Sequence, residues 1–420
     1  MVQSIRGVRD VLPEEARRWR VVEDTLRRIL AGFAYEEVHL PLLEFTELFS
    51  RGVGEATDIV AKEMYSLEDR DGTGITLRPE GTAGCARALQ QAGLLFNQTQ
   101  RVFYTGPMFR YERPQKGRYR QFAQIGAEVF GLAGPDVDAE LLALSWNFWQ
   151  ALGIDSQVTL ELNTLGSAQC RADFRQALVD YLTPQAKALD EDSQRRLTSN
   201  PLRILDSKSA QTREILENAP SLPDFIDAAS RDHFARLCEL LEQLGIGWTH
   251  NPQLVRGLDY YTHTVFEWVT AALGAQGTIC AGGRYDGLVE LIGGKPTPGA
   301  GFALGLERVI LLTENHGYLA EQDFSTASDV YCCVLNDIDQ GWVMSVAANL
   351  RQAQPNLRVR VHAGGGKLKN QLRRADLSGA SWALIIGEDE VANNQVTVKS
   401  LRDDTAQRTV AISALAELLK

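Results

Sequence analysis

The sequence lacks any apolar run near the roughly 20 residues that a helix needs to cross a bilayer. Its first stretch, MVQSIRGVRDVLPEEARR, contains no apolar core, so we expect no signal peptide and no membrane partner. The six cysteines form no CxxC pair and share no metal-ligand spacing with the six histidines. We therefore expect a cytoplasmic protein with buried thiols, no disulfide framework and no protein-bound metal.

An excess of basic residues is also missing. Lys and Arg number 43 against 54 Asp and Glu, which gives a formal net charge of −11. This balance excludes a uniformly basic surface, although a local basic track could still bind nucleic acid. With 44% hydrophobic and 23% charged residues, the 420-residue chain has the composition of a folded globular protein of about two or three domains.

Hydrophobic periodicity and the positions of proline predict the order of elements. A helix is expected over 13–32, because Pro13 suits the first helical position and an apolar stripe follows at helical spacing. A strand over 35–43 would carry Pro41, which should place it at a sheet edge, a bulge or an interface. Further elements are expected as a strand at 75–80, a helix at 82–93, two strands around a polar loop within 100–130, and a helix at 135–152.

The middle of the chain is charged, interrupted by prolines and free of strand patterns, which predicts a helical insertion over approximately 168–228. Strand and glycine patterns return at 248–312. After a polar linker, strands alternate with helices, which is typical of a small α/β domain. The sequence thus predicts an α+β protein with one domain over 1–325, including the insertion, and a second over 326–420.

The candidate site residues begin with the expected strand QFAQIGAEVF. Alternation places Gln124, Gly126 and Glu128 on one face, where two polar groups beside a bare glycine could form the floor of a site for a small polar ligand. A half-exposed strand with a solvated polar face would give the same pattern.

The segment before this strand is rich in arginine. Arg110 and Glu112 share a strand face, and the loop RPQKGRYR follows directly. Guanidinium groups match phosphate oxygens, so the loop could hold a nucleotide phosphate or an RNA end, or it could be a solvated basic turn. Its basic residues are Arg113, Lys116, Arg118 and Arg120.

Two further segments combine glycine with arginine. In GAGFALGLER, glycines would let a ligand approach a strand, and Arg308 at the start of a helix could lie over a flat ring. In LVRGLDYYTHTVFE, Arg256 interrupts an expected apolar strand, where a cation is costly unless it meets an anion. That anion could be Asp259 or a bound phosphate or carboxylate. Strand alternation would put Tyr260 and Tyr261 on opposite faces, so that only one lines the same pocket.

Residues 340–375 contain seven Lys or Arg and no Asp or Glu. In an acidic chain this stretch indicates a local site for a polyanion, or else a solubilising helix.

Taken in order, these segments resemble the histidyl-tRNA synthetases of bacterial type, which are class II aminoacyl-tRNA synthetases. The resemblance begins at IRGVRDVLP and covers nearly the whole chain. A first motif surrounds Pro41, the second resembles FRYERPQKGRYRQFAQIGAEVFG, and the third resembles GAGFALGLER. The two histidine-specific stretches are LVRGLDYYTHTVFE and CAGGRYDGL.

The resemblance implies a six-stranded antiparallel catalytic sheet, a helical insertion, a C-terminal α/β anticodon-binding domain, and a homodimer with the first motif at its interface. It also implies an ATP-dependent ligase that joins L-histidine to tRNA(His) through histidyl-adenylate, with Mg²⁺ on the ATP phosphates. A non-catalytic relative, the histidine-sensing regulatory subunit of ATP phosphoribosyltransferase, is the alternative. Such relatives typically lack the anticodon-binding domain and the catalytic arginines.

The resemblance also implies roles for single residues. Arg110 and Arg256 would be catalytic, with Arg110 on the α-phosphate and Arg256 between that phosphate and the histidine carboxylate. Glu112 and Arg308 would join Arg110 in binding ATP, and the loop of Arg113, Lys116, Arg118 and Arg120 would meet the tRNA acceptor end. The residues implied to bind histidine are Glu80, Thr82, Gln124, Glu128, Tyr260, Tyr261 and Tyr285.

Overall fold

The computed structural model describes residues 2–55, 57–205, 207, 209–321, 324, 326–335 and 338–419. The chain divides into two compact units, one formed by Met1–Leu12 and Arg18–Ala320 and the other by Pro13–Arg17 and Glu321–Lys420. Within the described ranges no helix has both the length and the hydropathy of a membrane span.

The first helix, α1 (Pro13–Gly32), has the predicted bounds, with Pro13 in its first turn and Val22, Leu26 and Leu30 fully buried. The strand predicted over 35–43 is wrong in extent: the chain forms only β1 (Glu36–Glu37) and β2 (Leu43–Phe45) there. Pro41 has no N–H to donate to a neighbouring strand. The carbonyl oxygens of Leu40 and Pro41 instead accept hydrogen bonds from Nη1 of Arg78, at 2.9 and 3.4 Å.

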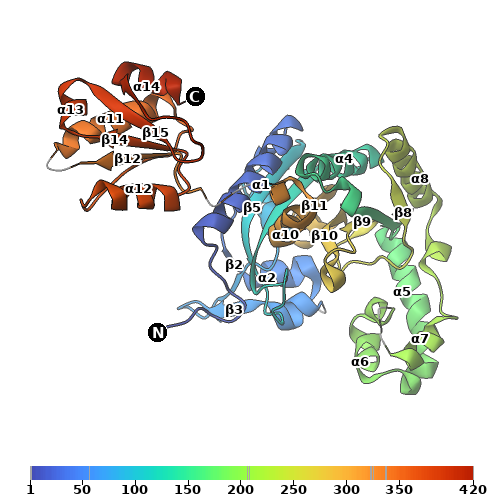
Figure 1. Cartoon of the computed structure of the whole chain (residues 1–420). Coiled ribbons are helices and arrows are strands. Elements are labelled where there is room, and N and C mark those ends of the chain that lie inside the picture. Colours follow the sequence, from blue (N-terminus) through green and yellow to red (C-terminus); the bar gives the residue numbers. More distant parts are fainter. Residues whose placement is uncertain are drawn as a thin grey trace. The chain divides into compact units, whose positions relative to one another are not determined.

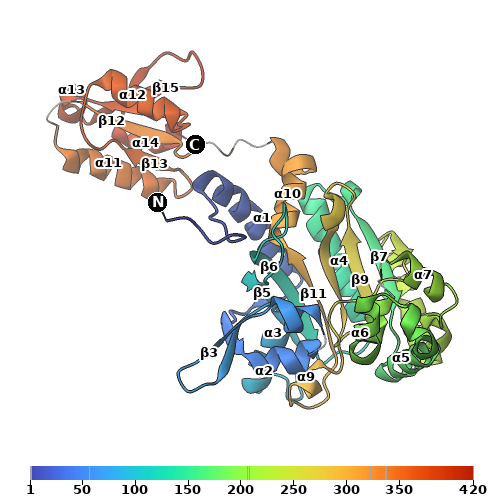
Figure 2. The same ribbon diagram turned by 90° about the horizontal axis from the view of Figure 1, so that it is seen from below.

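A small antiparallel sheet follows, in the order β2-β4-β3, with β3 at Tyr65–Glu68 and β4 at Gly74–Leu77. Short helical segments lead into and out of it. Figure 2 shows α2 and α3 grouped with α9 below the larger sheet, and contacts join α3 to both. Their bounds are α2 (Thr46–Phe49), η1 (Ser50–Gly54), η2 (Ile59–Glu63), α3 (Thr82–Gln91) and α9 (Leu288–Leu291).

The larger sheet has the order β1-β5-β6-β11-β10-β9-β7-β8 (Figure 1). Its six central strands are antiparallel, as the resemblance implied, and short parallel strands at both edges extend it. The strands are β5 (Gln100–Phe109), β6 (Gln121–Phe130), β7 (Thr159–Thr164), β8 (Trp248–His250), β9 (Thr262–Val269), β10 (Thr278–Arg284) and β11 (Gly299–Gly305).

The two faces of this sheet differ. In the register of β6 and β11, Gly301 lies opposite Glu128 and Gly305 opposite Gln124, so small residues on one strand leave space beside polar side chains on the other. Phe302 points to the opposite face, where its ring lies 6.0 Å from that of Phe148. The helices that pack on this second face are α4 (Pro135–Leu152) and α10 (Leu306–His316), with η3 (Asp155–Gln157), η7 (Gly274–Gln276) and η8 (Tyr318–Glu321) in the connections.

The insertion is helical, and its described residues between 168 and 243 contain no strand. Figures 1 and 2 show its helices at the end of the sheet that carries β7 and β8. Ser167, Asp190, Ser209 and Asp227 each accept an N–H in the first turn of the helix that follows, which explains where these polar segments begin. The helices are α5 (Ala168–Leu182), η4 (Thr183–Ala188), α6 (Glu191–Ser199), η5 (Pro201–Ile204), α7 (Ala210–Leu216), η6 (Leu222–Phe225) and α8 (Ala228–Gln243).

The second unit is the predicted α/β structure, with the strand order β13-β12-β14-β15-β16. The sequence did not predict β16, because its residues Arg408–Ala411 are mostly exposed and carry no alternating apolar pattern. The other strands are β12 (Val330–Val334), β13 (Val359–Val361), β14 (Trp382–Ile386) and β15 (Gln395–Ser400), and the helices are α11 (Gln340–Ala353), α12 (Leu368–Leu377), α13 (Glu388–Ala392) and α14 (Ile412–Leu418).

Candidate active site

A cavity of about 180 Å³ lies on the face of the large sheet that carries Gln124. It brings together side chains from the turn before α3, from β5, β6 and the loop between them, from the segment before β9, and from the start of α10. Its charged and polar lining residues are Glu80, Thr82, Tyr104, Arg110, Glu112, Arg118, Tyr119, Gln124, Arg256, Tyr260, Tyr261, Thr278, Glu307 and Arg308.

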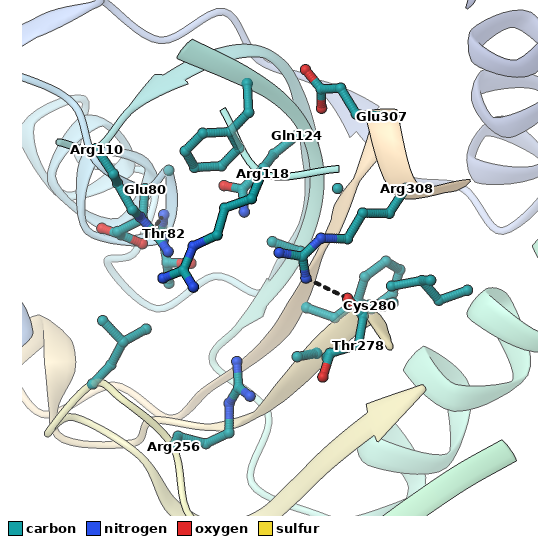
Figure 3. A pocket seen from close by; sticks show the side chains of 18 of the residues that line it. Glu80, Thr82, Arg110, Arg118, Gln124, Arg256, Thr278, Cys280, Glu307 and Arg308 are labelled. Atoms are coloured by element: carbon teal, nitrogen blue, oxygen red, sulfur yellow. Dashed lines mark hydrogen bonds between the residues drawn. The ribbon is translucent and has the colours of Figure 1, made fainter. Parts of the chain in front are cut away.

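Four arginines converge on this cavity, and Figure 3 shows their guanidinium ends in the same space. Arg110 Nε donates to the carbonyl oxygen of Pro79 at 2.8 Å. Arg308 donates to the carbonyl oxygens of Gly117 and Thr278 at 3.0 and 2.6 Å. Burial lowers the pKa of Arg110 and of Arg308, and the neighbouring arginine charges add to this effect. The cavity therefore holds several positive charges close together, and a bound anion would reduce the repulsion between them.

The other two arginines are paired with acids. Arg118 forms an ion pair with Glu112, and Arg256 forms one with Glu267. The prediction that Asp259 could be the partner of Arg256 is wrong, because Asp259 instead faces Asn200 and the cationic groups of the insertion. The sequence offered one signal for Glu267, since alternation along THTVFEWV places it on the face opposite Trp268, whose ring stacks on Trp146 of α4. Thr278 of the neighbouring strand donates to Glu267 at 2.7 Å.

The expected strand around Arg256 is also wrong. Residues 254–261 are irregular, and β9 begins only at Thr262. Strand alternation therefore does not apply to Tyr260 and Tyr261, and both line the cavity, with ring centroids 4.7 Å apart. The guanidinium carbon of Arg256 lies 5.7 Å from the centroid of the Tyr261 ring.

Glu128 lies one layer below the cavity surface and is fully buried. Its carboxylate accepts hydrogen bonds from Thr82 at 2.7 Å, from Tyr104 at 2.9 Å and from Tyr285. Burial raises the pKa of Glu128 to about 8, although the three hydroxyl donors act in the opposite direction. Glu128 and Tyr285 thus support the lining residues rather than line the cavity themselves.

Glycine is required beside this carboxylate. A Cβ on Gly301 would collide with the Glu128 carboxylate and lie 2.7 Å from the Tyr285 hydroxyl oxygen. Tyr104, which the sequence analysis did not identify, packs its ring where a Cβ on Gly126 would stand. The expected pairing of the two strands within 100–130 could have pointed to Tyr104, because their antiparallel register places it directly opposite Gly126.

Two polar groups at the cavity are arranged for a ligand with N–H donors. The Glu80 carboxylate accepts the backbone N–H groups of Thr82 and Ala83 at 2.7 and 3.0 Å, and burial raises its pKa. Gln124 has a buried Oε1 without a hydrogen-bond partner among the described residues. An unpaired buried acceptor is costly, so this oxygen marks a position for a ligand donor.

The basic residues of the predicted acceptor-end loop lie in different surroundings. Arg118 reaches the cavity, whereas Arg113 and Lys116 are exposed. The Arg120 guanidinium stacks 3.8 Å from the centroid of the Tyr111 ring. Within the described ranges, no cluster of three or more His, Cys, Asp or Glu side chains is arranged to hold a metal ion.

Two family models and several solved structures are similar to this chain. Residues 7–309 match the family model for histidyl-tRNA synthetase, and residues 329–420 match the model for an anticodon binding domain. The apo histidyl-tRNA synthetase of S. aureus is 33% identical over 100% of both chains, with a TM-score of 0.83.

Two more distant structures share the fold. The histidyl-tRNA synthetase of Nostoc sp. PCC 7120 is 22% identical over 99% of this chain and 98% of its own, with a TM-score of 0.70. A Bacillus halodurans protein described as an ATP phosphoribosyltransferase regulatory subunit/histidyl-tRNA synthetase is 21% identical over 89% and 96%, with a TM-score of 0.63.

Proposed function

The chain belongs to the histidyl-tRNA synthetase family, and on this premise we propose that it is an active ligase that joins L-histidine to tRNA(His) at the expense of ATP. The observation that carries the proposal is the convergence of Arg110, Arg256 and Arg308 on one cavity, directly above a buried carboxylate. A protein that only senses histidine has no need for three cations beside the amino acid.

Histidine would bind at the end of the cavity nearest Glu128. Its ammonium group would meet Glu80, Thr82 and the unpaired Oε1 of Gln124. Its imidazole would contact Tyr261 and displace one of the hydroxyl donors of Glu128, so that a ring N–H donates to the carboxylate. A site built around a buried acceptor rejects apolar analogues, because they leave that acceptor unpaired. Tyr260 and Tyr285, whose rings lie 5.5 Å apart, would close this pocket.

ATP would occupy the remainder of the cavity. Arg308 would lie over the adenine ring, and Arg110 would bind the α-phosphate with Glu112 nearby. Arg118, which borders the same space, would exchange its partner Glu112 for a phosphate oxygen. Mg²⁺ would enter with the ATP phosphates, and Glu112 offers the carboxylate oxygens that this cation prefers. When bound, the cation would neutralise charge on the departing pyrophosphate.

No protein nucleophile is required. A carboxylate oxygen of histidine attacks the α-phosphorus, and the bond to pyrophosphate breaks. Arg256, between the two reactants, would leave Glu267 and stabilise the negative charge that develops on the phosphate, together with Arg110. The terminal ribose hydroxyl of the tRNA then attacks the carbonyl carbon of the adenylate, and AMP leaves.

The second unit would supply the tRNA contacts distant from the cavity. Lys367, Lys369, Arg373 and Arg374 are all exposed at and along α12. Such a cluster in an acidic protein suits the phosphate backbone of RNA. The alternative, a histidine-sensing regulatory subunit, would need neither this cluster nor the arginines at the cavity.

We also propose a homodimer through the small sheet. Leu43, Phe45 and Leu67 are 47%, 63% and 48% exposed. In the sheet register Phe45 and Leu67 both lie opposite Ile75, so the apolar side chains are neighbours. A contiguous apolar face of this kind is typical of an interface. The free cysteines suit action in a reducing cytoplasm.

Pyrophosphate exchange tests the proposal. We expect histidine, alone among the amino acids, to support exchange of labelled pyrophosphate into ATP without tRNA. Histidine binding measured by calorimetry, without any exchange, would favour the regulatory function instead.

A further inference from the structure

The insertion contacts the segment that carries Arg256 and Tyr261. This segment, residues 254–261, is irregular, so no sheet ladder holds its backbone in place. It nevertheless supplies Arg256, Leu258, Tyr260 and Tyr261 to the cavity. Its conformation must therefore be set by contacts from outside the sheet.

Arg171, in the first turns of α5, provides such a contact. Its Nη1 donates to the backbone carbonyl oxygen of Asp259 at 2.8 Å and also to that of Tyr261. The two carbonyls flank Tyr260, so one guanidinium fixes the turn from which both tyrosines project. Burial lowers the pKa of Arg171, and the nearby charge of Asp259 raises it. A guanidinium stays protonated in either case, so both hydrogen bonds are charge-assisted.

The backbone around Arg171 is itself anchored to the large sheet. The N–H of His263 donates to Gly166 O at 2.7 Å, and the N–H of Leu165 donates to His263 O at 2.7 Å. Ser167 then caps α5 and donates to Asp227, which caps α8, at 3.0 Å. The position of Arg171 is thus determined by β9 and by both principal helices of the insertion.

The opposite side of the segment is held by η1. The N–H of Asp259 donates to Val53 O at 3.0 Å, and Gly54 lies against the Asp259 side chain. A narrow pocket between the segment and the insertion, lined by Arg171, Asn200 and Arg203 among mostly apolar residues, leaves space for the segment to shift when a contact is lost.

We propose that Arg171 is a positioning residue for the ligation reaction: it holds residues 254–261 so that Arg256 faces the α-phosphate and Tyr261 faces the histidine ring. The inference rests on the proposed function. It assigns the insertion a part in adenylate formation, a step in which tRNA takes no part. Because a displacement near 1 Å of a reacting group can cost about a hundredfold in rate, two hydrogen bonds far from the phosphate are sufficient for a measurable effect.

The test compares three variants of the full-length protein. In R171A we expect the kcat of pyrophosphate exchange to fall about tenfold to a hundredfold and the Kd of histidine to rise. The KM for ATP should change less than about twofold, because Arg110 and Arg308 stay in place. R171K keeps a charged donor and should recover part of the loss. R236A removes an exposed arginine of α8 that forms a surface ion pair with Glu239, and should behave as the wild type.

Hydrogen exchange separates positioning from folding. The amide of Asp259, bonded to Val53, should lose protection in R171A, while amides in the middle of α5 and α8 keep theirs. Unchanged exchange at 254–261 with kinetics within about twofold of the wild type would overturn the proposal. So would loss of protection throughout the insertion in both R171A and R171K, because the role would then be structural.

Failure of the proposed function gives a different result. A wild-type protein without pyrophosphate exchange would refute the ligase, whereas the histidine Kd and the exchange of the Asp259 amide would still report whether Arg171 holds the segment. An unchanged histidine Kd in R171A, together with unchanged protection, would refute the positioning role by itself.

Discussion

Arg284, at the end of β10, and Asp138, in α4, form a fully buried ion pair with 2.6 Å between Nη1 and Oδ1. Arg284 also binds Asp286 at 3.0 Å, and Asp138 also accepts from His233 and Thr264. The next residue, Tyr285, donates to Glu128. The ion pair therefore fixes the backbone from which a tyrosine reaches the buried carboxylate below the cavity.

Removing one partner of this pair should be strongly destabilising. D138A leaves the Arg284 guanidinium buried with Asp286 as its remaining acid, and we expect a loss of about 3–5 kcal/mol in the free energy of unfolding. Urea denaturation measures it, with D155A, an acid outside this network, as the control. A loss below about 1 kcal/mol would contradict the arrangement.

R256A should abolish most of the activity. It removes the cation that would face both histidine and ATP, and the loss of one group that stabilises transition-state charge costs about a hundredfold to a thousandfold in kcat. Pyrophosphate exchange measures it, and R236A is again the matched control. Sedimentation should show the same assembly as in the wild type. Near-normal turnover would refute the role of Arg256.

Glu128 should make stability depend on pH. Its folded-state pKa of about 8 lies above the ordinary value of 4.5, so its contribution is complete below pH 4.5 and is lost as the pH rises through about 8. We expect the wild type to lose stability relative to E128Q between about pH 5 and 8, by on the order of a few kcal/mol. Glu307, with a pKa of about 7, is present in both proteins and cancels in the comparison.

G301A should damage the proposed histidine pocket without replacing an ionisable residue. The added methyl would meet the Glu128 carboxylate, and overpacking of this kind costs about 1–3 kcal/mol. We expect the affinity for histidine, measured by calorimetry, to fall as well. G247A is the control, because a Cβ there meets nothing within 4 Å. Equal behaviour of the two variants would count against the close packing at Gly301.

Charge reversal on α12 should separate the two reaction steps. The triple variant K367E/K369E/R373E should weaken aminoacylation and reduce the salt dependence of tRNA binding, because phosphate contacts release counterions. Pyrophosphate exchange without tRNA should not change. If both activities fall together, the cluster is needed for folding rather than for binding tRNA.

The sequence by itself determined the elements and the chemical inventory. The apolar stripe of α1, the glycines of β11 and the alternation in β6 are local patterns, and each produced the element that was expected. The order of the motifs was also sufficient to identify the family. These features depend on residues near one another in the chain, where spacing and turn propensity decide the outcome.

Tertiary structure decided which groups meet. Asp259 is close to Arg256 in sequence, yet Arg256 pairs with Glu267, because β9 brings that carboxylate back beside the irregular segment. Tyr260 and Tyr261 both line the cavity, because Arg171 of the insertion and η1 hold a turn there instead of a strand. Long-range packing overrides local alternation at such a place, since a side chain's direction follows the backbone that distant contacts impose.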